Sequence, residues 1–239
     1  MPFRSFGGGR RGGGRIIIAV LIAIGSLISY YSVTQENPVT GEKQHIGIAP
    51  EQEIALGLEA MPTMMQQYGG ESDDMDARAI VQRVGQKIVE SSPAGKSDYK
   101  SNFVFHLLAD NQTVNAFALP GGQIFITEAL YRQLTSEDEL AGVLGHEIGH
   151  VIARHSAEQM AKARLTQGLT GAAVIATYDP GNPATTQTAA FAQLIGQMVN
   201  MRYGREDELE ADKWGVKLMG EAGYDPYALI EVMNILEKA

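Results

Sequence analysis

One stretch of sequence, His146-Glu147-Ile148-Gly149-His150, decides how this chain is interpreted. It continues an apolar run over residues 140–145 that is typical of a buried helix. Residues four apart share one face of a helix, so the imidazoles of His146 and His150 can point at the same ion. Glu147 can then lie beside an ion-bound water and act as general base. The pattern H-E-x-x-H predicts a zinc site, and the rival interpretation is two surface histidines with a solvated glutamate.

A catalytic zinc site needs a third protein ligand and an open position for water. Some enzymes supply a third histidine in the pattern H-E-x-x-H-x-x-G-x-x-H. Here Ala153 and Ser156 occupy the two required positions, and His155 is one residue out of register. Other enzymes supply a glutamate from a later helix, and this chain favours that solution.

The later acidic segment, residues 205–215, contains a suitable glutamate. Glu208 and Asp212 are four apart and share one helix face, so Glu208 can bind the metal while Asp212 reaches a ligand imidazole. Metal-bound histidines usually donate their second N–H to a carboxylate or carbonyl. Glu206 and Glu210 fall on other faces, where we expect them to be solvated. Without the H-E-x-x-H motif, an ordinary charged helix would be the better interpretation.

Together these segments resemble the gluzincin family of zinc metallopeptidases, which includes HtpX and the CaaX prenyl protease. The bacterial envelope members with a soluble catalytic domain are the more similar ones. The resemblance covers roughly residues 50–239 and rests on H-E-x-x-H, on Glu208-Leu209-Glu210-Ala211-Asp212, and on segments at 115–122, 124–127, 137–141 and 222–226.

The resemblance implies one Zn²⁺ per chain with His146, His150 and Glu208 as metal ligands. It also implies that Glu147 is the catalytic base and Asp212 a second catalytic acid. The family role of that aspartate is often proton donation, whereas the spacing favours a role in orienting a ligand histidine. The sequence leaves both roles open.

The N-terminal region is expected to attach the chain to a membrane. Residues 1–15 contain Arg4, Arg10, Arg11 and Arg15 and no acidic residue, and residues 16–33 form an uncharged stretch of 18 residues. That length is the lower limit for a membrane-spanning helix, and the basic flank predicts that residues 1–15 stay in the cytoplasm. A cleaved signal peptide is the rival interpretation, but no A-x-A site follows the apolar stretch.

The remaining composition limits the partners of the chain. The net charge is −9, and because residues 1–33 carry four arginines and no acid, residues 34–239 carry −13. An acidic body argues against nucleic acid as a partner, although a Gly/Arg-rich tail can bind RNA. The chain has no cysteine, which excludes disulfides and thiolate metal sites.

These observations predict an α+β fold: a mainly helical, zincin-like metallopeptidase domain with a small antiparallel sheet, preceded by one transmembrane helix. The expected units are a basic tail and anchor at 1–33, an irregular linker at 34–50 and the zinc metallopeptidase domain at 51–239. We expect helices at 51–68 and 73–91, strands at 103–108, 115–119 and 123–127, and a capped helix after Ser136. The apolar segments 165–178 and 188–201 are too short to span a membrane, so we expect packed or lid helices there.

The expected function is zinc-dependent endoproteolysis of unfolded or misassembled envelope proteins by a single-pass protein of the bacterial inner membrane, with its catalytic domain outside the cytoplasm. Protein or peptide substrates are expected to add an extended strand to an exposed sheet edge, for which residues 123–127 are the candidate. Arg205 is a candidate for binding the oxyanion, and surface pairing with Glu206 or Asp207 is its alternative role. The alternative from another class is a chaperone or binding module with a structural zinc.

Overall fold

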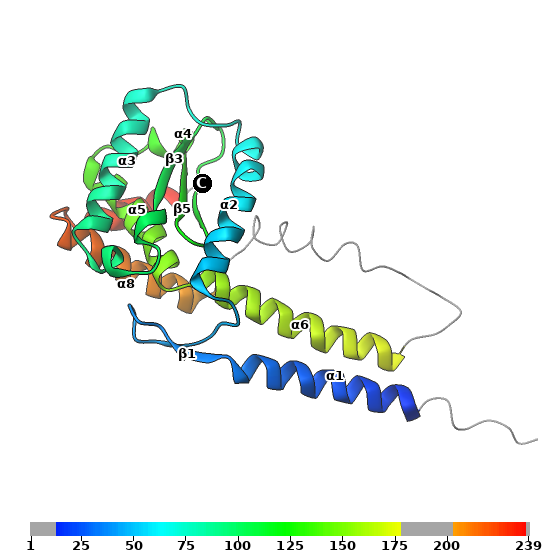
Figure 1. Ribbon diagram of the computed structural model, residues 1–239. Coiled ribbons are helices and arrows are strands. Elements are labelled where there is room, and N and C mark those ends of the chain that lie inside the picture. The colour runs from blue at the N-terminus through cyan, green and yellow to red at the C-terminus, as the bar shows by residue number, and fades with distance from the viewer. Residues whose placement is uncertain (1–12, 178–202, 238–239) are drawn as a thin grey trace, which may run out of the picture.

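The computed structural model describes residues 13–177 and 203–237, and helices make up most of it (Figure 1). The α-helices are α1 Gly13–Ser32, α2 Pro50–Gln67, α3 Met75–Glu90, α4 Glu128–Tyr131, α5 Glu137–Ile152, α6 His155–Thr177, α8 Arg205–Glu221 and α9 Ala228–Glu237. Two 3₁₀ turns, η1 Pro93–Lys96 and η2 Lys100–Asn102, precede the sheet. The strands are β1 Thr34–Glu36, β2 Lys43–His45, β3 Val104–Leu108, β4 Ala116–Leu119 and β5 Gln123–Thr127.

The expected α+β fold with a small sheet and one N-terminal apolar helix is confirmed. The three-stranded sheet has the order β3-β5-β4, in which β4 pairs with β5 antiparallel, as expected. β3 pairs with β5 parallel, so the sheet is mixed. The tight turn after β4, where Gly121 and Gly122 have φ angles of +82° and +110°, returns the chain beside β4. β5 therefore lies between the two other strands.

This strand order corrects the expected substrate edge. Residues 123–127 form β5, which has a neighbour on both sides and is buried along its whole length. Ile124 and Ile126 belong to one apolar cluster of the core and Phe125 to the other, because alternate side chains of a strand point to opposite faces. The edge strand on this side of the sheet is β4.

Helix α5 forms the centre of the larger cluster. Ser136 begins it, its Oγ accepting a hydrogen bond from the backbone N–H of Glu139 at 3.2 Å, as the expected cap requires. Every residue from 139 to 152 is buried, and α5 contacts α3, α8, α9 and β4. On the other face of the sheet, α2 covers β4 and β5 (Figure 1). A helix buried on all sides matches the apolar run that precedes the motif.

Helices α5 and α8 approach backbone to backbone. A Cβ atom on Gly149 would lie 3.0 Å from the carbonyl oxygen of Ala211, and one on Gly145 would lie 3.2 Å from that of Gly215. A Cβ on Gly215 would in turn lie 3.1 Å from the backbone nitrogen of His146. The absence of side chains at these positions brings the acidic segment of α8 over the motif of α5.

Helix α1 projects from the domain and lies beside α6 (Figure 1). Residues 14–32 are long and apolar enough to cross a membrane, and 6% of that span is buried. The following segment is not irregular throughout, because β1 and β2 form an antiparallel hairpin. Of the two apolar segments expected to pack, residues 165–177 belong to α6, whereas residues 188–201 lie outside the described part of the chain.

Candidate active site

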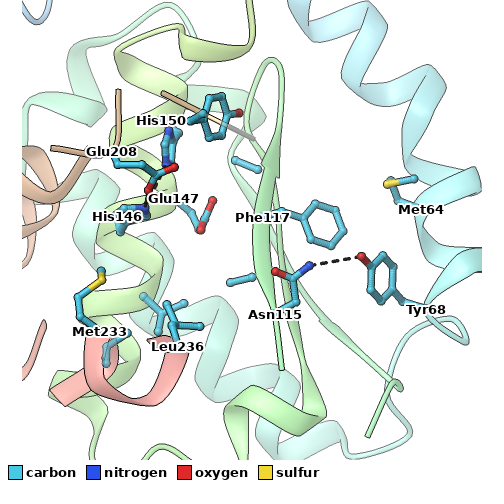
Figure 2. A pocket seen from close by; sticks show the side chains of 15 residues that line it. Met64, Tyr68, Asn115, Phe117, His146, Glu147, His150, Glu208, Met233 and Leu236 are labelled. Carbon is cyan, nitrogen blue, oxygen red and sulfur yellow. Dashed lines mark hydrogen bonds and ion pairs between the residues drawn. The ribbon is translucent and has the colours of Figure 1, made fainter. Parts of the chain in front are cut away.

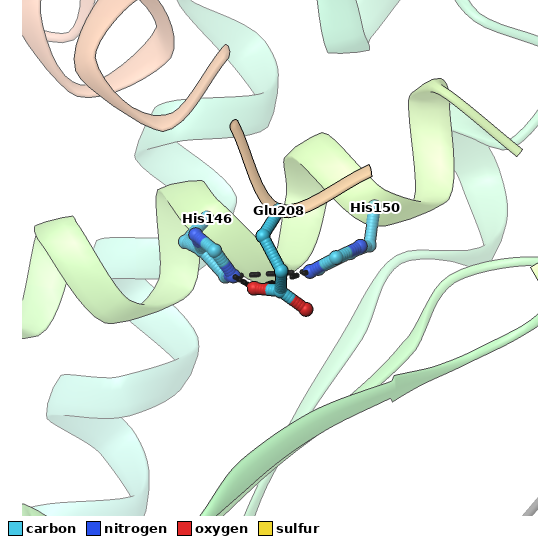
Figure 3. Close-up of side chains that lie close together, drawn as sticks. All are labelled: His146, His150 and Glu208. Carbon is cyan, nitrogen blue, oxygen red and sulfur yellow. Dashed lines mark hydrogen bonds and ion pairs between the residues drawn. The ribbon is translucent and has the colours of Figure 1, made fainter. Parts of the chain in front are cut away.

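Three side chains from two helices converge on one point (Figure 3). Nε2 of His146 and Nε2 of His150, both on α5, lie 3.0 Å apart. Oε2 of Glu208, on α8, lies 3.4 Å from Nε2 of His146 and 3.9 Å from Nε2 of His150. The structure thus brings together the three residues that the sequence predicts as metal ligands.

The donor set fits a zinc ion. Two imidazoles and one carboxylate form a His₂Glu set, and about 3.3 Å separates two nitrogens bound to one tetrahedral zinc at about 2.0–2.1 Å. The nitrogens of His146 and His150 face each other at 3.0 Å, close to that value. The three residues also line a cavity of about 440 Å³, which gives access to the open fourth position of such a site (Figure 2).

Asp212 contacts His146, one of the two candidate ligand histidines. Its Oδ1 lies 2.9 Å from Nδ1 of His146, the ring nitrogen that faces away from Glu208. Burial lowers the pKa of His146, but the hydrogen bonds to Asp212 and Glu208 outweigh this effect and raise it to about 10. The spacing predicts this contact, which an orienting role for Asp212 requires.

His150 also has polar neighbours on the side of its ring away from Glu208, namely His155 and, beyond it, Glu210. Nδ1 of His150 is 2.9 Å from Nδ1 of His155, and Nε2 of His155 is 3.3 Å from Oε2 of Glu210. The expectation that Glu210 is solvated is therefore wrong, because its side chain is 24% exposed and contacts a buried histidine. Glu206 is exposed, as expected.

Glu147 is buried and lines the same cavity as the histidines (Figure 2). Burial raises its pKa to about 7, and the nearby Glu208 carboxylate adds to this, while His146 opposes it. The backbone of Ala118 on β4 also acts to lower this pKa. A carboxyl group with a pKa near neutrality has the proton affinity of an efficient general base.

Tyr203 lines the cavity, and the sequence analysis did not predict it. The Tyr203 ring stacks on the His150 ring at a centroid distance of 4.1 Å, and its hydroxyl lies 2.8 Å from Oγ of Ser156. Its position just before the acidic helix was the one available signal. The candidate oxyanion residue Arg205 is exposed and is not among the residues that line the cavity.

Comparison with known proteins places these features in a family. The profile of Peptidase family M48 matches residues 76–238. The chain is 32% identical over 217 residues to the mitochondrial metalloendopeptidase OMA1 of Schizosaccharomyces pombe, covering 89% of this chain and 60% of that relative. It is 31% identical over 184 residues to a putative beta-barrel assembly-enhancing protease of Vibrio cholerae, covering 75% of this chain and 36% of the relative. The Escherichia coli beta-barrel assembly-enhancing protease is 32% identical over 159 residues, 62% of this chain and 30% of its own length. The chain thus spans 60% or less of the length of these relatives.

Proposed function

The chain belongs to peptidase family M48, and from that premise we propose that it is a membrane-anchored zinc endopeptidase that hydrolyses unfolded or misassembled proteins of the cell envelope. One observation carries the proposal: His146, His150 and Glu208 converge at the wall of a cavity that also contains the buried carboxyl group of Glu147. The convergence supplies a metal site and a general base side by side.

The proposed chemistry assigns one task to each residue. His146, His150 and Glu208 would hold a zinc ion, which would supply Lewis acidity and would lower the pKa of water bound to it toward neutrality. Glu147 accepts a proton from the attacking water and passes it to the leaving amine. Asp212 keeps the His146 ring in place through its hydrogen bond at 2.9 Å. A proton-donating role for Asp212 is the alternative.

The substrate is proposed to bind as an extended strand along β4. This strand is the edge of the sheet next to α5, and Ala116, Phe117 and Ala118 line the cavity together with Glu147. Backbone hydrogen bonds to an edge strand accept many side-chain sequences. Such recognition suits unfolded proteins, and the beta-barrel assembly-enhancing proteases among the relatives are consistent with a substrate in the envelope.

The proposed location follows from the N-terminal region. Helix α1 carries Arg15 at its start and no charge from residue 16 to residue 32. The arginines of the first 15 residues favour a cytoplasmic N-terminus, so residues 34–239 would lie outside the cytoplasm of a bacterium. The proposed organisation is therefore a tail and anchor at 1–33, a connecting segment at 34–50 and the peptidase domain at 51–239. A mitochondrial metalloendopeptidase is also among the relatives, so the bacterial envelope location belongs to the proposal.

The test compares zinc content and casein hydrolysis between two glutamate variants of the full chain, each purified in detergent. Glu147→Gln removes the proposed base without removing a ligand, so zinc should stay near one ion per chain while casein hydrolysis is lost. Glu206→Gln, an exposed control, should retain both properties. Cleavage by Glu147→Gln at a near wild-type rate would contradict the mechanism. A wild-type chain that binds zinc but cleaves nothing would instead support the alternative, a chaperone or binding module with a structural zinc.

A further inference from the structure

A histidine and a glutamate outside the proposed ligand set reach the second ligand histidine from behind. Nδ1 of His155 lies 2.9 Å from Nδ1 of His150, and Nε2 of His155 lies 3.3 Å from Oε2 of Glu210. His155 is 1% exposed, and its ring also contacts the ring of Tyr203. This arrangement differs from that of His146, whose Nδ1 meets the carboxylate of Asp212 directly.

His155 is not placed to bind the ion itself. The atom of His150 that faces His146 and Glu208 is Nε2, whereas His155 contacts Nδ1 on the opposite side of the ring. Any ion held by the three convergent groups therefore has the His150 ring between itself and His155. The role of His155 must act through that ring.

The direction of the two hydrogen bonds follows from the chemistry of a metal-bound imidazole. When Nε2 of His150 gives its lone pair to an ion, the proton of the neutral ring is on Nδ1. Nδ1 of His150 must then donate, so Nδ1 of His155 accepts. The proton of His155 is consequently on Nε2, where it can be donated to the carboxylate of Glu210. Only one pair of tautomers satisfies both contacts and leaves the metal-binding nitrogen of His150 free.

We propose that His155 and Glu210 are positioning residues that hold the ring of His150 in the orientation and tautomer needed to bind the metal. The proposal rests on the proposed function in one respect, namely that His150 is a metal ligand. Each proposed ligand histidine is then oriented by a carboxylate of α8. Asp212 orients His146 directly, and Glu210 orients His150 through His155.

The fold fixes His155 at the required place. Helix α5 ends at Ile152 and α6 begins at His155, and between them Arg154 takes a left-handed backbone conformation with φ of 58°. A non-glycine residue held in this region needs support from its surroundings. The buried Arg154 side chain supplies it, donating from Nε to Oε1 of Glu53 at 2.8 Å and from a terminal nitrogen to the carbonyl oxygen of Ile48 at 2.9 Å.

The experiment measures metal affinity in the full chain by competition with a chelator. Glu210→Ala should weaken zinc binding by about 10- to 100-fold, the range for partners that orient ligand histidines. Glu206→Ala removes the same charge from an exposed position of the same helix and should leave the affinity within about 2-fold of wild type. Glu210→Gln retains an oxygen that accepts from His155 and should recover most of the affinity lost in Glu210→Ala.

Two further readouts separate positioning from general stability. Glu210→Ala removes the acceptor for Nε2 of His155, so it should lower the melting temperature of the metal-free chain, and in addition it should reduce the increase in melting temperature that zinc produces. Its Co²⁺ derivative should have an altered visible absorption spectrum, because the His150 ring is no longer fixed. His155→Ala should show the same changes; if it fails to fold, the partly exposed Glu210 variants still decide the question.

The outcomes also separate this proposal from the proposed function. If wild-type chain binds no zinc, or if His150→Ala binds it normally, the metal site itself is wrong. If His150→Ala loses zinc while Glu210→Ala matches Glu206→Ala in affinity and in Co²⁺ spectrum, the metal site stands and the positioning role is overturned. Equal loss of zinc in Glu210→Gln and Glu210→Ala would overturn the role of the accepting oxygen.

Discussion

The side-chain nitrogen of Asn37 donates to the carbonyl oxygen of Ile152 at 2.8 Å, and so joins the segment after the apolar helix to the end of the helix that carries both histidines. Asn37 is 1% exposed, and the neighbouring Gln44 donates to the carbonyl oxygen of Ala153 in the same way. The last carbonyls of a helix have no partner within it. Side chains of the hairpin formed by β1 and β2 therefore cap the C-terminal end of α5.

Asn37→Ala should destabilise the domain by about 1–3 kcal/mol, because it leaves a buried carbonyl without a donor. In a chain of this length, that corresponds to a decrease in melting temperature of roughly 2–4 °C per kcal/mol. Thermal unfolding of the detergent-solubilised chain measures it. Glu42→Ala, at an exposed position of the same hairpin, is the control, and equal stabilities of the two variants would contradict the capping role.

Asp212→Asn should weaken both zinc retention and casein hydrolysis by about 10- to 100-fold, because the asparagine no longer offers a charged acceptor to Nδ1 of His146. Competition with a chelator measures the zinc affinity, and initial rates on the same preparations measure casein hydrolysis. Full zinc affinity with no hydrolysis would favour direct proton donation by Asp212. Normal values for both would remove Asp212 from the site.

Gly149→Ala should separate α5 from α8, since its Cβ would lie 3.0 Å from the carbonyl oxygen of Ala211. Overpacking of this kind costs about 1–3 kcal/mol, and moving α8 also moves Glu208, so zinc affinity should fall together with stability. Gly171→Ala on α6 is the matched control, since a Cβ there meets nothing within 4 Å. Its stability should be unchanged or higher by up to about 1 kcal/mol. A fully stable, zinc-binding Gly149→Ala chain would show that the close approach is unimportant.

Glu71→Gln should reduce stability in a pH-dependent manner. Burial alone raises the pKa of Glu71, but the hydrogen bond from His106 and the charge of Arg78 outweigh it and hold that pKa below its ordinary value of 4.5. A lowered folded-state pKa gives stability that is present above the unfolded-state pKa and is lost as the pH falls through the folded-state value. The difference in unfolding free energy between wild type and Glu71→Gln should be about 0.5–1 kcal/mol at pH 7 and should shrink below about pH 4.5. Denaturant titrations at pH 7 and pH 3.5 measure it, and a constant difference would contradict the assignment.

Alkaline carbonate should leave the full chain in the membrane fraction, because residues 14–32 are apolar enough to span a bilayer. A reporter fused after residue 40 should be active outside the cytoplasm, in the orientation set by the N-terminal arginines. Reporter activity in the cytoplasm would contradict the topology. Release of a form shortened by about 30 residues would show that the apolar helix is a cleaved signal peptide.

Local spacing was sufficient to pair the candidate site residues within each helix, whereas the resemblance to the gluzincin family implied that Glu208 joins the two histidines. His146 and His150 are one helical turn apart, and Glu208 and Asp212 are one turn apart on a second helix, so each pair needs only a helix to share a face. The strand boundaries and the Ser136 cap also depend on neighbouring residues alone. These features could be predicted because their physics is local.

The order of the strands and the contacts of His150 with His155 and of His155 with Glu210 could not be predicted in this way. That β5 lies between β3 and β4 depends on contacts across the whole sheet, and the sequence pattern of a buried strand is the same in either position. The contact between His155 and His150 depends on the left-handed turn at Arg154, for which the sequence offers no glycine or asparagine as a signal. Helix periodicity alone therefore predicts a solvated Glu210.

Because the candidate metal site joins residues from two helices, it affects how well the chain tolerates insertions between those helices. His150 and Glu208 are separated by 57 residues, and an ion bound to both would close that stretch into a loop. In a chain with no cysteine, a bound ion would cross-link the chain as a disulfide does, and the chain-entropy model gives about 4 kcal/mol for a disulfide that closes a loop of this size. Loop-closure entropy grows slowly, by about 0.6 kcal/mol for each doubling of length. Insertions between α5 and α8 should therefore change the stabilisation from this cross-link only slightly, whereas a chelator that removes the ion should abolish it.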